Sequence, residues 1–256
     1  MMRKVLFFAI LIFMVFNSMA QTEKINNGHF EIRYDKDVKK YALKSARILN
    51  FAWDKAEELG FNPPKNMKFN LVKSERKRLF VPKDKTTTII LEYTALDGSE
   101  KWINYVYGLC HEMGHVCMFH ITPHKNNWMT TAYREGWAHI FGESMTVLLN
   151  EKYGIDVWPN PYDYLARLDS SMTKRAKDIE NGKYKLDNVI SEVFWKKLVE
   201  EKGIDKMPFF FRQIKSNKVG KPFADKKFRE ELVKLDVSND LLDYFDKNKQ
   251  YLIRLE

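Results

Sequence analysis

Residues 111–115 read His-Glu-Met-Gly-His, and this stretch decides how the rest of the sequence is interpreted. On a helix, residues at i and i+4 lie one turn apart on the same face, so His111 and His115 can direct both imidazole rings at one metal ion. Glu112 stands at the rim of that face. The pattern is typical of a zinc helix whose glutamate acts as a general base.

A third metal ligand is expected from a second helix. Glu135 follows His115 by twenty residues and lies early in a helix predicted over 131–153. Two antiparallel helices joined by a turn bring this side chain back across the histidines. Two histidines and one glutamate leave a fourth coordination position open, as in catalytic rather than structural zinc sites. We therefore predict a Zn²⁺ ion bound by His111, His115 and Glu135.

The hydrophobic pattern around these helices indicates an α+β fold. Strands are predicted where apolar residues alternate or β-branched residues gather, and helices where apolar residues recur with a 3.6-residue period. The predicted strands are 29–34, 67–72 and 86–93, and the main predicted helices are 36–59, 101–120, 131–153, 162–181, 187–202, 207–216, 225–235 and 239–247. The strands come first in the chain and most helices follow, which predicts two subdomains. The first, over 21–155, is α+β and carries the metal site, and the second, over 156–256, is all-helical.

Two motifs together resemble a known family. His111-Glu112-Met113-Gly114-His115 and Glu135-Gly136-Trp137-Ala138 are similar to the gluzincin clan of metallopeptidases, which includes thermolysin and the aminopeptidase-like enzymes. The similarity runs from the strand at Phe30 to about Lys215, with the elements in the clan's order. It implies a zincin-like fold for the first subdomain and hydrolysis of peptide bonds.

The resemblance also assigns roles to residues. His111, His115 and Glu135 would bind zinc, and Glu112 would activate a zinc-bound water as the general base. The clan places an edge strand beside the active-site cleft. That strand would here be Thr88–Tyr93, and it would pair with an extended peptide substrate by adding a strand to the sheet.

Two positions depart from the clan's pattern. Thermolysin-like members carry an Asp four residues after the ligand glutamate, where it orients a zinc histidine, and here that position is His139. The clan also supplies a Tyr or His from a later segment to stabilise the oxyanion. No histidine follows His139, so a tyrosine must serve. Tyr184 is the candidate, and Tyr153, Tyr162 and Tyr164 are the alternatives.

The leading interpretation is a zinc metallopeptidase that acts on peptides or proteins. Glycoproteins are included as substrates, since the HExGH pattern with a downstream glutamate also occurs in mucin-degrading relatives. The alternative is a zincin-like zinc-binding or scaffold protein with little or no peptidase activity, which the two departures favour. An aminopeptidase is disfavoured because no Gly-Ala-Met-Glu-Asn-like motif precedes the motif helix.

The first twenty residues have the pattern of a secretory signal peptide. A basic start at Arg3 and Lys4 precedes an apolar run over 5–16, and Asn17-Ser18-Met19-Ala20 offers a small-residue cleavage site. The protein is therefore expected outside the cytoplasm, secreted or periplasmic, with no stable membrane span after cleavage. An uncleaved anchor is the alternative, because the apolar run is only slightly shorter than a membrane span.

Charge and cysteine content exclude two other classes. Removing Arg3 and Lys4 lowers the formal net charge from +9 to about +7, but the basic residues are scattered and no nucleic-acid motif occurs, so no nucleic-acid partner is expected. Cys110 and Cys117 lie two helical turns apart, about 10 Å along the axis. A disulfide needs Cα atoms within about 7 Å, so both are expected to be free and buried.

Overall fold

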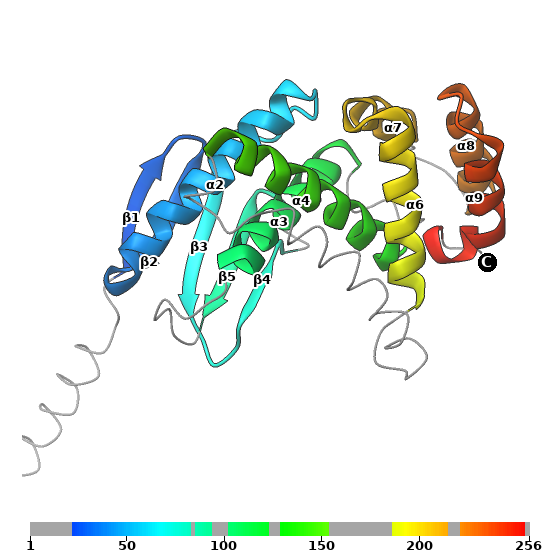
Figure 1. Ribbon diagram of the computed structural model, residues 1–256. Helices are drawn as coiled ribbons and strands as arrows, with labels where there is room; N and C mark the ends of the chain where they lie inside the picture. The colour runs from blue at the N-terminus through cyan, green and yellow to red at the C-terminus, as the bar shows by residue number, and fades with distance from the viewer. Residues whose placement is uncertain are drawn as a thin grey trace, which may run out of the picture.

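The computed structural model describes residues 22–82, 85–93, 102–122, 129–153, 186–214 and 221–253. They form an α+β fold with a five-stranded sheet at one end and a group of helices at the other (Figure 1). The predicted signal peptide and the predicted helix over 162–181 lie outside these ranges. No helix within them is long and apolar enough to cross a membrane.

The sheet has a parallel centre and an antiparallel strand on each side. Its order is β1 (Thr22–Asn27), β2 (Phe30–Asp35), β3 (Met67–Lys73), β5 (Thr88–Tyr93) and β4 (Arg78–Phe80). The three predicted strands are confirmed as β2, β3 and β5, but β1 and β4 were missed. β1 is almost entirely polar, and β4 has only three residues, too few for a period of two to be recognised.

The prediction that Thr88–Tyr93 is the edge strand is wrong. β5 is hydrogen-bonded on both sides, with Phe69 of β3 opposite Ile89 and Leu79 of β4 opposite Leu91. The chain turns back after β3, and β4 then pairs antiparallel with β5 and covers its outer side. The edge of the described sheet on this side is therefore β4, Arg78–Phe80.

Helix α2 (Lys39–Glu58) connects β2 to β3 and packs between the sheet and the next helix. Small buried residues at helical spacing let it lie close to its neighbours, among them Ala42, Ala46, Ala52 and Ala56. Gly60 follows the end of the helix, with a φ of +87°, a conformation that favours glycine.

Helices α3 (Trp102–Ile121) and α4 (Thr131–Tyr153) form the centre of the molecule (Figure 1). From Leu109 to Phe119 every residue of α3 except His111 is buried, because α2, β4 and α4 all pack against it. The helix is therefore enclosed around nearly its whole circumference at the candidate ligands. Cys110 and Cys117 are buried and free, as expected.

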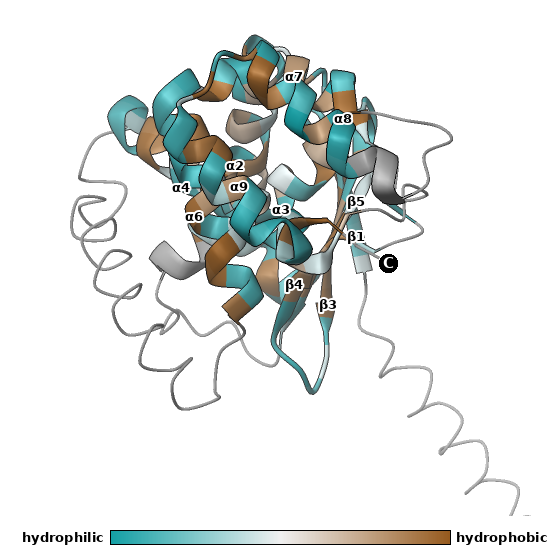
Figure 2. Ribbon diagram, turned by 90° about the vertical axis from the view of Figure 1, so that its right-hand side faces the viewer, coloured by the Kyte–Doolittle hydropathy of each residue, from teal (hydrophilic) through white to brown (hydrophobic). Residues whose placement is uncertain are grey.

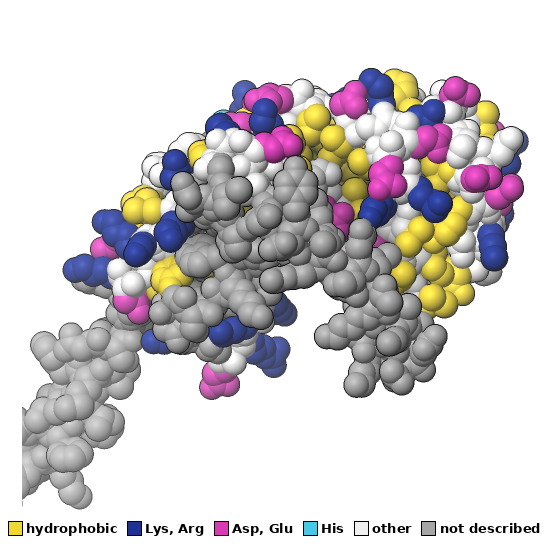
Figure 3. Space-filling view, viewed as in Figure 1, with side chains coloured by type: hydrophobic (Ala, Val, Ile, Leu, Met, Phe, Trp, Pro, Cys, Tyr) yellow, Lys and Arg dark blue, Asp and Glu magenta, His cyan; other side chains and the backbone are white. Residues whose placement is uncertain are grey.

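The remaining helices pack on α4 through an aromatic core. They are α6 (Leu186–Lys202), α7 (Met207–Ile214), α8 (Lys221–Lys234) and α9 (Asn239–Leu252). Trp137 of α4 lies at the centre, with its ring centroid 5.4 Å from Trp195 and 4.8 Å from Phe211. Hydrophobic residues gather on the inward sides of the helices (Figure 2), and on one outer face basic and acidic side chains lie interspersed (Figure 3).

Gly136→Ala is expected to destabilise the fold, because α4 and α6 touch at this residue. A Cβ at Gly136 would lie 2.7 Å from the backbone carbon of Ser191, so the helices would have to move apart. Overpacking of this kind costs about 1–3 kcal/mol. Urea denaturation of the zinc-free protein should show a lower free energy of unfolding.

Gly108→Ala is the matched control on another helix. Its Cβ would meet only a Leu79 methyl, at 3.0 Å, and Leu79 is a flexible side chain. Alanine is better than glycine in a helix by up to about 1 kcal/mol, so this variant should be neutral or slightly more stable. Equal stabilities for the two variants would contradict the proposed contact between α4 and α6.

Candidate metal centre

The three predicted ligands converge at one point between α3 and α4. Oε2 of Glu135 lies 3.4 Å from Nε2 of His111 and 3.5 Å from Nε2 of His115. One ligand atom from each residue falls within 4.8 Å of the others. The two imidazole rings are nearly perpendicular, at 86°, and point toward the carboxylate from neighbouring turns of α3. The structure thus brings together the residues that the sequence nominated.

Thr130 holds the N-terminal end of α4, and this fixes the position of Glu135, which lies in the first turns of that helix. Oγ1 of Thr130 accepts a hydrogen bond from the Tyr133 backbone N–H at 3.0 Å, which caps the helix. The same hydroxyl donates to the carbonyl oxygens of Tyr251 at 2.7 Å and Leu252 at 3.2 Å. The Thr130 N–H also donates to the Leu252 carbonyl. Residues late in the chain therefore hold the helix that carries the third ligand.

α4 lies close against α3 at the metal centre. The indole N–H of Trp137 donates to the Gly114 carbonyl at 3.1 Å, inside the His-Glu-Met-Gly-His stretch. A Cβ at Gly114 would lie 3.1 Å from Cα of Ala138, and a Cβ at Gly142 would lie 3.2 Å from Cα of His111. Glycine at both positions therefore permits the close approach of the helices that carries Glu135 to the histidines.

The ligand atoms are in the ionisation states that a metal requires. Burial lowers the pKa of His111 to about 4, so its ring is neutral. Burial alone would raise the pKa of Glu135, but the hydrogen bonds from His111 and His115 outweigh it and hold this pKa well below its usual range. Two imidazoles and one carboxylate form a nitrogen and oxygen donor set that suits Zn²⁺. The residues present therefore fit the predicted ion.

Glu112 lies beside the metal centre and faces the edge of the sheet. The backbone N–H of Val81, just after β4, hydrogen-bonds to its carboxylate, while Oε2 is buried with no hydrogen-bond partner. Burial raises the pKa of Glu112 to about 7. A carboxyl group with such a pKa can take up and return a proton near neutral pH, as a general base must.

Three further residues lie around His111. His139 stands at the sequence position of the orienting Asp, whereas Tyr107 and Glu143 were not predicted as part of the site. The Tyr107 hydroxyl lies 3.5 Å from Nδ1 of His111 and hydrogen-bonds to Nδ1 of His139, whose Nε2 is 3.2 Å from Oε1 of Glu143. Tyr107 precedes His111 by four residues, and Glu143 follows His139 by four. Same-face spacing on a helix could therefore have indicated both contacts.

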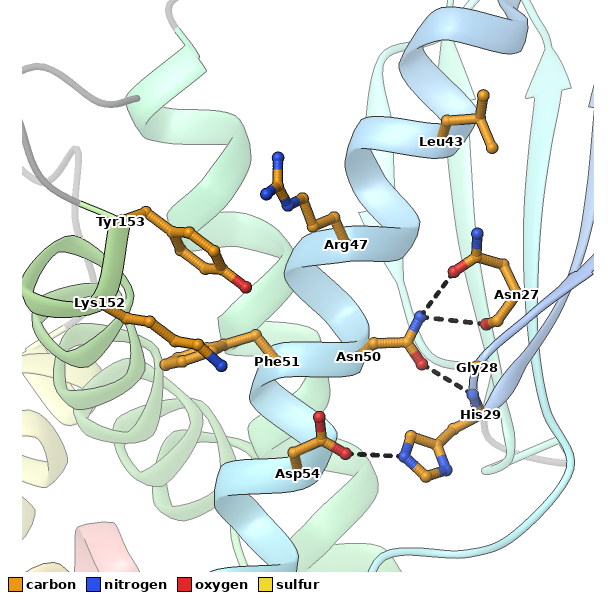
Figure 4. A pocket seen from close by; sticks show the side chains of 10 residues that line it. All are labelled: Asn27, Gly28, His29, Leu43, Arg47, Asn50, Phe51, Asp54, Lys152 and Tyr153. Carbon is orange, nitrogen blue, oxygen red and sulfur yellow. Dashed lines mark hydrogen bonds and ion pairs between the residues drawn. The ribbon is translucent and has the colours of Figure 1, made fainter. Parts of the chain in front are cut away.

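Of the four tyrosines proposed to stabilise the oxyanion, only Tyr153 lies within the described residues. Tyr162, Tyr164 and Tyr184 lie outside the described residues. Tyr153, at the end of α4, lies away from the metal centre and lines a separate pocket of about 460 Å³ (Figure 4). Oxyanion stabilisation by Tyr162, Tyr164 or Tyr184 stays a prediction, and the position of Tyr153 does not support that role for it.

The pocket at Tyr153 is built from α2, the β1–β2 turn and the end of α4. One side carries the charged heads of Arg47 and Lys152, which lie 4.9 Å and 5.5 Å from the centroid of the Tyr153 ring (Figure 4). On the other side Asn50 accepts from the His29 N–H at 2.7 Å and donates to Asn27, which ties the turn to α2. Both basic side chains are exposed, and no residue of the metal centre lines this pocket.

Comparison with known proteins gives a likeness in fold only. No protein-family model matches this sequence, and no curated protein is significantly similar to it. A crystal structure of a mutant of a functionally unknown conserved protein from Bacillus anthracis str. Ames is similar, with a TM-score of 0.53 and 11% sequence identity. The similarity covers 92% of this chain and 53% of that chain, so this chain spans about half the length of its structural relative.

Proposed function

We propose that this protein is a zinc-dependent peptidase of the zincin type that acts on peptides or proteins outside the cytoplasm. The observation that carries the proposal is the convergence of His111, His115 and Glu135 on one point, with the Glu112 carboxylate beside them. The predicted signal peptide supports the location. The gluzincin-like motifs support the reaction class.

The residues of the site divide the work of hydrolysis between them. His111, His115 and Glu135 would hold the ion, which when bound supplies a Lewis acid for the scissile carbonyl and for water. Glu112 would orient the attacking water through a carboxylate oxygen and accept its proton. It would then return that proton to the leaving amine, a role that its raised pKa supports.

The sheet edge beside Glu112 is the proposed place for the substrate backbone. β4 is the outer strand of the described sheet on this side, and Val81, the residue after it, contacts Glu112. An extended peptide that pairs with β4 would run past the metal centre and Glu112. We therefore propose strand addition at Arg78–Phe80 instead of Thr88–Tyr93.

Metal removal is the direct test of the proposal. The purified protein is expected to contain about one zinc per chain and to cleave a mixed peptide library, because three ligands leave one position open for chemistry. A chelator should abolish cleavage, and added Zn²⁺ should restore it. Metal content by mass spectrometry of native protein and peptide products by chromatography are the two measurements.

The same experiment separates the proposal from its alternative, a zinc-binding or scaffold protein with little turnover. Stoichiometric zinc without cleavage of any peptide would favour the alternative. Protein without zinc would contradict the metal centre itself. Glycosylated and deglycosylated forms of one substrate protein, assayed in parallel, show whether sugar chains are part of what is recognised.

A further inference from the structure

Tyr107 connects the metal centre to a buried histidine that binds no metal in the proposed site. It lies one turn before His111 on α3, and its hydroxyl is 3.5 Å from Nδ1 of His111. On the other side the hydroxyl hydrogen-bonds to Nδ1 of His139 on α4. The Tyr107 and His139 rings pack edge to face, with centroids 5.3 Å apart. A single hydroxyl therefore bridges the two rings.

His111, Tyr107, His139 and Glu143 contact one another in series. The Glu143 carboxylate decides which atoms donate in the hydrogen bonds of Tyr107. Oε1 of Glu143 lies 3.2 Å from Nε2 of His139 and can only accept, so the proton of a neutral His139 belongs on Nε2. Nδ1 of His139 is then an acceptor, and the Tyr107 O–H donates to it. The other carboxylate nearby, Glu192, is 3.9 Å from Nδ1, too far for a hydrogen bond.

The same logic fixes the tautomer of His111. With its proton directed at His139, the Tyr107 oxygen presents a lone pair to Nδ1 of His111. With zinc bound, His111 would carry its proton on Nδ1 and offer the ion the lone pair of Nε2, the atom that otherwise hydrogen-bonds to Glu135 at 3.4 Å. A histidine binds a metal through the nitrogen without a proton, and the hydrogen bond at its other nitrogen decides which one that is.

We propose that Tyr107 and His139 are positioning residues that hold His111 in the tautomer whose Nε2 binds the metal. This rests on the metal centre of the proposed function and extends it to residues that touch neither metal nor substrate. In this chain the pair takes the place of the Asp that orients a zinc histidine in thermolysin-like enzymes. His139 stands at the sequence position of that Asp but reaches His111 through the tyrosine.

The first test is the zinc affinity of Tyr107→Phe, measured by competition with a chromogenic chelator. The variant keeps the ring and removes only the hydroxyl. Loss of an outer hydrogen bond to a metal histidine weakens binding by about 10–100-fold, and the same range is expected here. Tyr93→Phe is the matched control, because it removes a tyrosine hydroxyl bonded to Asp35 at 2.8 Å, away from the metal. The dissociation constant of zinc from the Tyr93→Phe variant should equal that from the unmodified protein.

The second test asks whether His139 acts through Tyr107. His139→Leu removes the acceptor of the Tyr107 proton, so the hydroxyl can donate to Nδ1 of His111 instead, which favours the wrong tautomer. Its zinc affinity should fall at least as far as that of Tyr107→Phe. In the Tyr107→Phe background the same substitution should change the affinity by less than about twofold, since residues in one network are not additive. Additive losses would overturn the proposed connection.

NMR tests the hydrogen bond between His111 and Tyr107 directly, without a measurement of zinc affinity. In the zinc-loaded protein the Nδ1–H proton of His111 should give a downfield, slowly exchanging NMR signal, which Tyr107→Phe removes and Tyr93→Phe retains. An unchanged signal and an unchanged dissociation constant in Tyr107→Phe would refute the inference while the metal centre stands. Zinc binding without peptidase activity would refute only the proposed enzyme. A chain that binds no zinc would overturn both.

Discussion

Glu112→Gln is expected to abolish peptide hydrolysis while zinc stays bound. Glutamine has the shape of glutamate but cannot accept the proton of the attacking water. Loss of a general base lowers the rate by about 10²–10⁴-fold. Zinc affinity should be nearly unchanged, because the converging ligand atoms belong to His111, His115 and Glu135. The measurements are kcat on a peptide substrate and the zinc content of the same preparation.

We expect no folding defect in Glu112→Gln. A neutral amide costs less to bury than a carboxylate, so the free energy of unfolding should not decrease. Glu58→Gln is the control for the chemical change, since Glu58 is exposed and pairs only with Lys55 on the surface of α2. Full activity in Glu112→Gln would refute the assigned base.

Glu135→Gln is expected to remove the metal. Glutamine keeps the volume of the side chain but loses the charge that balances a divalent cation between two neutral imidazoles. Removing one outer hydrogen-bond partner already weakens metal binding by about 10–100-fold, and loss of a ligand should exceed the upper end of that range. Competition with a chelator measures the dissociation constant, and peptidase activity should fall with it at limiting zinc.

Glu92→Gln is the control for Glu135→Gln. Glu92 is largely buried and accepts a hydrogen bond from Arg78 at 3.1 Å, so this variant also breaks a carboxylate contact, but outside the metal centre. It should bind zinc as tightly as the unmodified protein. If Glu135→Gln also bound zinc with unchanged affinity, the third ligand would have to be another residue.

The convergence of the three candidate metal ligands could be predicted from the sequence because it follows from helix spacing and a simple helix pair. The i, i+4 spacing of His111 and His115 puts both on one helix face, and two antiparallel helices return Glu135 to them. Glu135-Gly136-Trp137-Ala138 then proves to be a packing motif as well. Trp137 bonds to α3 and Gly136 contacts α6, which explains why these residue types stand beside the ligand.

The misplaced edge strand shows where the sequence was insufficient. Thr88–Tyr93 has the composition of a strand, but its neighbours depend on whether another segment covers its outer side. That segment, Arg78–Phe80, is three residues long and has no periodicity of its own. It becomes a strand because β5 offers unpaired backbone groups, which is a tertiary effect.

The contact between His111 and His139 through Tyr107 could not be predicted from the sequence. Tyr107 and His139 each share a face with a ligand on their own helix, so spacing alone could have placed both near the metal centre. Whether their side chains meet depends on the distance between α3 and α4. Gly114 and Gly142 set that distance. Larger residues at these two positions would push the helices apart and separate the Tyr107 ring from the His139 ring.

The hydrogen bonds of Thr130 bear on how the protein is made. The first turn of α4 is held by Tyr251 and Leu252, more than 120 positions later in the chain. A ribosome releases residues in order, so a nascent chain that already contains both histidines and Glu135 still lacks the contacts that anchor the ligand helix. We therefore expect the candidate metal centre to gain its final geometry only after residue 252 has been synthesised.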